Sequence, residues 1–148
     1  MEEARIPADP VYLQAVGRTF YNFTYLEWVV VWTIAKLRPD GFGGVPKGET
    51  ASRIAKALIK AIDQTQPSLP SGLRHSLVKF HEAYLRAIPR RNKLLHAHPF
   101  TATDGSQQLG GGGYQWPVEE LRAAALEFQE AAIMGNDIFH GELAQVRP

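Results

Sequence analysis

The sequence predicts an all-α protein, an up-and-down bundle of four or five helices. Apolar residues recur every three or four positions along most of the chain, which is the spacing of one helix face. Proline and glycine interrupt this pattern at residues 39–46, 67–70 and 99–117, where turns would connect the helices. Before the last helix we expect a glycine-rich loop or a small hairpin.

Local signals place the first two helices. Asp9-Pro10 combines a capping side chain with a proline at the first helical position, so one long helix is expected at about 10–38. Residues 1–8 are expected to form an N-terminal arm. A second amphipathic helix follows the break, and its apolar face comprises Ala51, Ile54, Leu58 and Ile62.

A third helix is expected to begin near Ser71 and to reach Pro89, which must end it, kink it or start a new one. Residues 91–98 would then form a short helical continuation. The segment 99–116 contains four consecutive glycines and is predicted to be a loop excursion. Pro117 opens the last helix.

Composition limits the class of protein. With 148 residues and 45% hydrophobic content, the chain is predicted to form a single domain, 1–148. A net charge of +1 means that any nucleic-acid site must be local. The absence of cysteine and the polar start predict a cytoplasmic protein. The most apolar stretch, 26–37, is shorter than the ~20 residues that span a bilayer, so no membrane association is expected.

Charged residues interrupt the stripes of apolar residues that are expected to face the core on the first and third helices. Continuing the stripe of the third helix past Pro89 places Arg91, Leu95 and His98 at inward positions, and Glu27 falls on the inward face of the first helix. Isolated buried ions are strongly disfavoured, so we expect these charges to meet. The pattern allows a structural ion pair, a Glu27 at the solvated rim, or a polar site cut into the core.

Basic residues and histidines gather in the same part of the chain, which favours a phosphate-handling site over an ordinary solvated face. Between residues 74 and 98 the residues are Arg74, Lys79, Arg86, Arg90, Arg91 and Lys93, with His75, His81, His96 and His98, against the single acid Glu82. On a helix, His96 and His98 would point roughly 200° apart, so we expect neither a metal site nor a cofactor.

The segment Arg91-Asn92-Lys93-Leu94-Leu95-His96 resembles the signature of the HEPN superfamily, in which four to six residues separate an arginine from a histidine. Arg90 with His96 (five intervening residues) and Arg91 with His98 (six) also satisfy the spacing, but the polar residue that follows Arg91 favours the register Arg91 to His96. The resemblance implies a four-helix bundle that forms a homodimer and brings both copies of the motif into one cleft.

The resemblance also implies a metal-independent endoribonuclease, related to toxin or defence proteins. His96 would be its acid/base, Arg91 would stabilise the phosphate and Asn92 would orient the imidazole. We expect Glu27 to hold Arg91 or His96. The supporting residues would be Glu27, His98, Arg90 and Lys93.

The alternative is a catalytically inactive HEPN-like dimer that binds nucleotide or RNA, or that serves as a protein-interaction module such as one half of a toxin and antitoxin pair. A homodimer is also expected from the apolar first helix, with Trp28 and Trp32, and from a small-residue face on the last helix. The 99–116 excursion is expected to border the cleft as a lid or guide.

Overall fold

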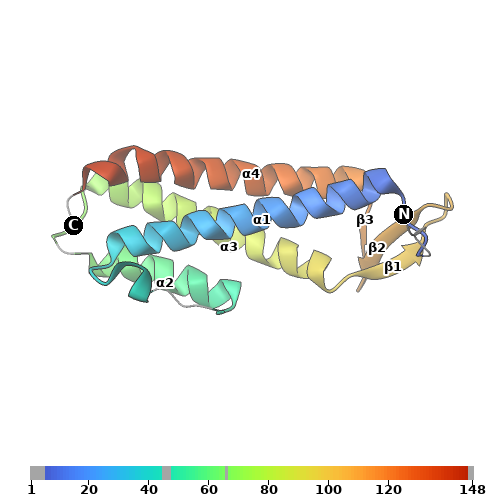
Figure 1. Cartoon of the computed structure of the whole chain (residues 1–148), viewed down its shortest axis with the longest axis horizontal. Coiled ribbons are helices and arrows are strands. Elements are labelled where there is room, and N and C mark those ends of the chain that lie inside the picture. The colour runs from blue at the N-terminus through green and yellow to red at the C-terminus, as the bar shows by residue number, and fades with distance from the viewer. Residues whose placement is uncertain (1–5, 45–47, 66, 147–148) are drawn as a thin grey trace, which may run out of the picture.

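Four α-helices and a small antiparallel sheet form the fold (Figure 1). The computed structural model describes residues 6–44, 48–65 and 67–146. The elements are α1 (Pro10–Leu37), η1 (Gly41–Gly44), α2 (Ala51–Gln64), α3 (Ser71–Leu95), β1 (His98–Thr101), β2 (Gln107–Gly111), β3 (Tyr114–Trp116), α4 (Val118–His140) and η2 (Glu142–Gln145). Residues 6–8 of the expected arm are exposed, and the rest of that arm lies outside the described residues.

The helix boundaries agree closely with the local sequence signals. Asp9 caps α1 by accepting a hydrogen bond from the Val11 N–H (2.9 Å), and Pro10 is the first helical residue. α3 continues through Pro89, which is exposed, so the carbonyl group that loses its N–H partner can be solvated. Of the described helices, none has the length and apolar character needed to cross a membrane.

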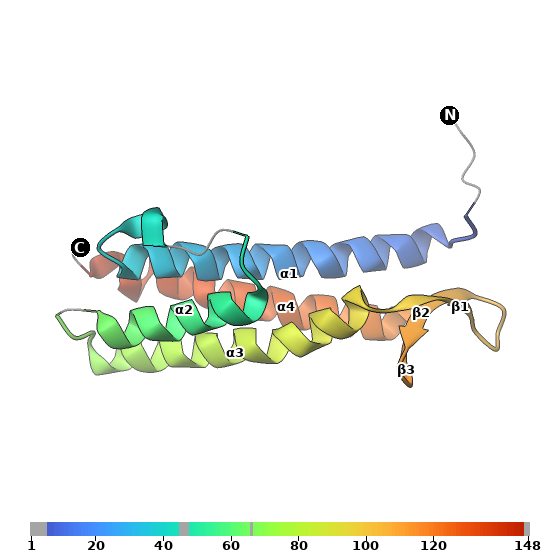
Figure 2. The same ribbon diagram turned by 90° about the horizontal axis from the view of Figure 1, so that it is seen from below.

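α1 and α4 run side by side in the same direction (Figures 1 and 2). The Thr19 hydroxyl lies 3.0 Å from the Leu121 carbonyl oxygen, and the Asn22 amide donates to the Ala125 carbonyl (2.9 Å). In a simple up-and-down bundle the first and fourth helices are antiparallel, so this part of the prediction is wrong. The reason is the long connection at 38–50, after which α2 runs in the same direction as α1 (Figure 2).

Residues 98–116 form a three-stranded antiparallel sheet in the order β1-β2-β3, beside the end of the bundle where α1 begins (Figure 1). An entirely α-helical fold is therefore incorrect, although the small hairpin was anticipated. Tyr12 of α1 holds the sheet: its hydroxyl donates to the Trp116 carbonyl (2.5 Å) and accepts from the Leu109 N–H (2.8 Å). Residues 98–116 are thus attached to α1 through Tyr12, and the side chain of Trp116 in this segment is buried.

Small residues on α4 serve packing within the chain. A Cβ atom on Gly135 would lie 2.3 Å from the ring of Phe80 in α3. Ala125 and Ala132 are also buried. The small-residue face that suggested a second chain is therefore already covered by the protein's own helices.

Two glycine substitutions in helices should change stability in opposite directions. Gly135→Ala should lower the free energy of unfolding by about 1–3 kcal/mol, because the new methyl group would overlap the Phe80 ring. Gly17→Ala in α1 has no neighbour within 4 Å and should raise stability by about 0.5–1 kcal/mol. Urea denaturation of both variants provides the measurement. Equal effects would contradict the close approach of α3 and α4.

Candidate functional site

Arg91 lies in the last turns of α3 and extends toward α1. Its guanidinium carbon is 4.6 Å from the centroid of the Phe23 ring, a cation–π contact. The side chain is half-buried, and its Nε atom is buried without a hydrogen-bond partner. Within the part of the chain that the structure describes, no carboxylate forms an ion pair with Arg91. The inward position predicted for this cation is therefore only partly correct, since its head is not fully enclosed.

Glu27 binds Tyr84 rather than Arg91 or His96. The Tyr84 hydroxyl donates a 2.6 Å hydrogen bond to Glu27 Oε2. Burial raises the pKa of the Tyr84 phenol, the hydrogen bond to Glu27 raises it further, and the positive charge of Arg91 opposes this shift. The expectation that Glu27 holds the arginine or the histidine directly is thus incorrect: Tyr84, a buried residue of α3, binds the carboxylate instead.

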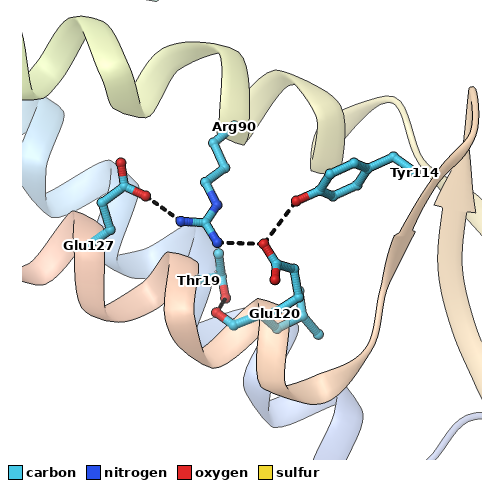
Figure 3. Close-up of polar contacts among 6 residues, drawn as sticks. Thr19, Arg90, Tyr114, Glu120 and Glu127 are labelled. Carbon is cyan, nitrogen blue, oxygen red and sulfur yellow. Dashed lines mark hydrogen bonds and ion pairs between the residues drawn. The ribbon is translucent and has the colours of Figure 1, made fainter.

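Arg90 has a separate, structural environment (Figure 3). Its guanidinium pairs with Glu120 (2.6 Å) and with Glu127, both on α4. The Tyr114 hydroxyl of β3 donates a second hydrogen bond to Glu120 (2.8 Å). Arg90 therefore connects α3 to α4 and, through Glu120, to the sheet.

The other cation of the motif also faces the sheet. The Nζ atom of Lys93 lies 4.8 Å from the centroid of the Tyr114 ring. Of the predicted supporting residues, Lys93 contacts Tyr114 directly, and Arg90 is linked to Tyr114 through Glu120.

His96 and His98 lie beyond the helical part of the motif. His96 is the exposed C-cap of α3, and its backbone N–H donates to the Asn92 carbonyl (3.1 Å). No side-chain hydrogen bond joins Asn92 to His96, two residues that the structure describes, so the orienting role of Asn92 remains a prediction. On an ideal helix Arg91 and His96 would lie about 140° apart around the axis, an angle that a long arginine side chain can close.

The inward phase assigned to the end of α3 was wrong. Leu95 is 53% exposed, whereas its neighbour Leu94 is buried. His98 is exposed at the first position of β1 instead of lying on the inner face of a helix. The cause is that the buried position which follows Ile88 in α3 is Leu94, and the helix ends one residue later, at Leu95.

A shallow hollow of about 170 Å³ opens beside His98 on the sheet. Phe100, Tyr114 and glycines of β2 are among the residues that line it. A Cβ atom on Gly110 would lie 2.8 Å from the Phe100 ring, so the glycine is required for that ring to lie against the strand.

The remaining imidazoles and cations do not gather at one point. His81 is buried in α3, and burial lowers its pKa. Arg74 pairs with Asp63 of α2 (2.6 Å). Among the described residues there is no group of three or more His, Asp or Glu side chains that could hold a metal ion.

Sequence reasoning missed Tyr84, Tyr114, Glu120 and Glu127, which give the two arginines their different surroundings. One signal was present: Glu120 and Glu127 are seven residues apart, so they lie on the same side of α4. Comparison of the chain with protein-family models, with curated proteins and with solved structures found no match. The resemblance to the HEPN superfamily therefore depends on the motif and the helical layout alone.

The ion pair of Glu120 should make stability depend on pH. The hydrogen bond from Tyr114, followed by the contacts with Arg90, lowers the pKa of the Glu120 carboxyl. A carboxyl whose folded pKa is lowered adds stability above its unfolded pKa of about 4.3, and that stability is lost as the pH falls through the folded pKa. Glu120→Gln should therefore reduce the free energy of unfolding by up to about 1 kcal/mol near pH 7, and by less near pH 3.

Glu119→Gln is the matched control, because Glu119 is the exposed neighbour and has no ion pair among the described residues. Chemical denaturation at both pH values measures the difference. A loss of stability that is the same at both pH values would show that the charge of Glu120 does not contribute.

Proposed function

We propose that this protein is a HEPN-like, metal-independent endoribonuclease whose site is formed by Arg91 and His96. The supporting observation is the different pairing of two adjacent arginines. Arg90 is bound by two carboxylates, whereas Arg91 has an aromatic ring and no carboxylate partner in the described chain. An arginine without a carboxylate can bind the oxygens of a phosphodiester, so Arg91 is the better candidate of the two registers.

In the proposed reaction, exposed His96 accepts the proton of a ribose 2′-hydroxyl. The 2′-oxygen then bonds to phosphorus, the bond from phosphorus to the 5′-oxygen breaks, and that oxygen takes up a proton from water. The products would be a 2′,3′-cyclic phosphate and a 5′-hydroxyl. Arg91 would stabilise the charge that develops on the phosphate oxygens. The hollow beside His98 would guide the RNA strand.

A second candidate function is an inactive HEPN-like module that binds RNA or nucleotide. One observation favours it: in the described chain, no hydrogen bond to another side chain holds the His96 imidazole. An acid/base group usually needs such a partner to fix its orientation. The same motif would then supply affinity without turnover.

The ribonuclease proposal predicts RNA cleavage in the presence of EDTA, with fragments that end in 2′,3′-cyclic phosphate. His96→Ala and Arg91→Ala should each reduce the rate by about 10²- to 10⁴-fold, because one loses the proton acceptor and the other the phosphate-binding cation. Arg86→Ala is the control, since Arg86 is an exposed arginine on the same helix. Gel electrophoresis of labelled RNA measures the rates, and circular dichroism checks the fold.

If the wild type leaves RNA intact, and if a ligand raises the melting temperature of the wild type but not of Arg91→Ala, the ribonuclease proposal is wrong and the binding module is supported. Cleavage that persists equally in both motif variants would show that the activity does not arise from this site.

A further inference from the structure

α1 and α4 lie side by side (Figure 1), and a hollow of about 380 Å³ lies along the seam between them. Arg18 of α1 and Arg122 of α4 line it, together with the amide side chains of Gln14, Asn22 and Gln129. Among the described residues that line this α1–α4 hollow, none is acidic. The hollow therefore offers many hydrogen-bond donors and a net positive charge.

The register of the two helices brings the two arginines to nearly the same level. The Thr19 hydroxyl and the Asn22 amide contact carbonyl groups of α4 that belong to residues 102 and 103 positions later in the chain. Arg18 and Arg122 are 104 positions apart, so they differ from this register by only one or two residues, about 1.5–3 Å along the axes. Both guanidinium groups can therefore reach one ligand in the hollow.

The charges of these arginines are not neutralised within the described chain. Neither Arg18 nor Arg122 forms an ion pair with a carboxylate there. Two cations at the same level of neighbouring helices repel each other, and an anion held between them would replace the repulsion with two attractive contacts. The hollow is therefore electrostatically complementary to an anion.

We propose that the α1–α4 hollow binds a small phosphorylated sugar, with its phosphate group between Arg18 and Arg122. A guanidinium group donates two parallel hydrogen bonds to phosphate oxygens, and this geometry favours phosphate over a spherical anion. A phosphate monoester carries a charge of about −1.5 to −2 at pH 7, which matches two arginines, whereas a carboxylate carries only one charge.

The rest of the hollow suits hydroxyl groups. Gln14 lies four residues before Arg18, and Gln129 lies seven residues after Arg122, so the two amides are about 6 and 10 Å from the arginines along the helix axes, in opposite directions. A glutamine amide both donates and accepts hydrogen bonds, as a sugar hydroxyl does. The hollow is also larger than a phosphate ion, so it has room for the sugar beside the phosphate.

A small phosphate ester fits this site better than an RNA strand. Exposed Glu119 lies three residues before Arg122 on α4. Exposed Glu130 lies four residues after Leu126, which also lines the hollow. Residues three or four apart are neighbours on a helix surface, so these acids lie beside the hollow and would repel a polyanion that continued past it.

The α1–α4 hollow is separate from the Arg91 motif. Arg91, Asn92 and His96 are not among the described residues that line it. Arg91 contacts the buried ring of Phe23, whereas Arg18 is exposed. The sugar phosphate site does not depend on the ribonuclease proposal, and either can fail without the other.

The test is isothermal titration calorimetry of the full chain at constant ionic strength, with glucose 6-phosphate, inorganic phosphate and glucose as probes. Glucose 6-phosphate should bind saturably, inorganic phosphate should bind more weakly, and glucose should not bind. Arg18→Gln and Arg122→Gln should each raise the Kd for glucose 6-phosphate by at least about tenfold, because each removes one charged pair of hydrogen bonds.

Two variants are the controls, and circular dichroism checks the fold of all four. Arg86→Gln should leave the Kd unchanged, because Arg86 is also an exposed arginine without an ion pair in the described chain, but it lies on α3. His96→Ala should also leave it unchanged, which separates this site from the motif.

Four outcomes would overturn the proposal. The first is no saturation by glucose 6-phosphate up to about 10 mM. The second is equal affinity for glucose 6-phosphate and inorganic phosphate, which would indicate an adventitious ion only. The third is a Kd that neither Arg18→Gln nor Arg122→Gln changes. The fourth is tighter binding of a single-stranded oligonucleotide that both variants weaken, which would make the hollow part of a nucleic-acid surface.

Discussion

The close parallel passage of α4 along α1 is the constraint on which the rest of the fold depends. It brings the Thr19 hydroxyl and the Asn22 amide onto the carbonyl groups of α4. Because both helices start at the same end, the chain must return through α3 and then change direction, and the sheet provides that change (Figure 1). One side of this helix pair closes the core around Phe23 and Phe128, and the other side exposes large apolar side chains such as Trp28 and Leu126.

The different contacts of Arg90 and Arg91 follow from helix geometry. Adjacent residues point about 100° apart, so one guanidinium extends toward α4 and the other toward α1. On α4, Glu120 and Glu127 neutralise the first cation. On α1, the ring face of Phe23 contacts Arg91, and the single acid of this helix, Glu27, accepts a hydrogen bond from Tyr84. Two adjacent arginines thus differ in whether carboxylates neutralise their charge, because their neighbours differ.

Local signals predicted the helices well, because caps and prolines act within a few residues of themselves. Asp9-Pro10 and Pro117 mark helix starts that the structure confirms. The direction of α2 was missed. For 98–116 a loop or a small hairpin was expected but not a three-stranded sheet, which depends on contacts that are distant in sequence, such as Tyr12 with Trp116. The apolar pattern identified Glu27 as unusual but could not identify its partner, because tyrosine counts as apolar in such a pattern while its hydroxyl is a donor.

The Tyr12 hydroxyl is both donor and acceptor, and each partner belongs to a different strand. A three-stranded sheet of this size is not stable alone, so it persists only while α1 is folded beneath it. The sheet and the first turns of α1 should consequently open as one cooperative unit. Their backbone amides would then share a common protection against hydrogen exchange, in contrast to the gradual fraying usual at the end of a helix.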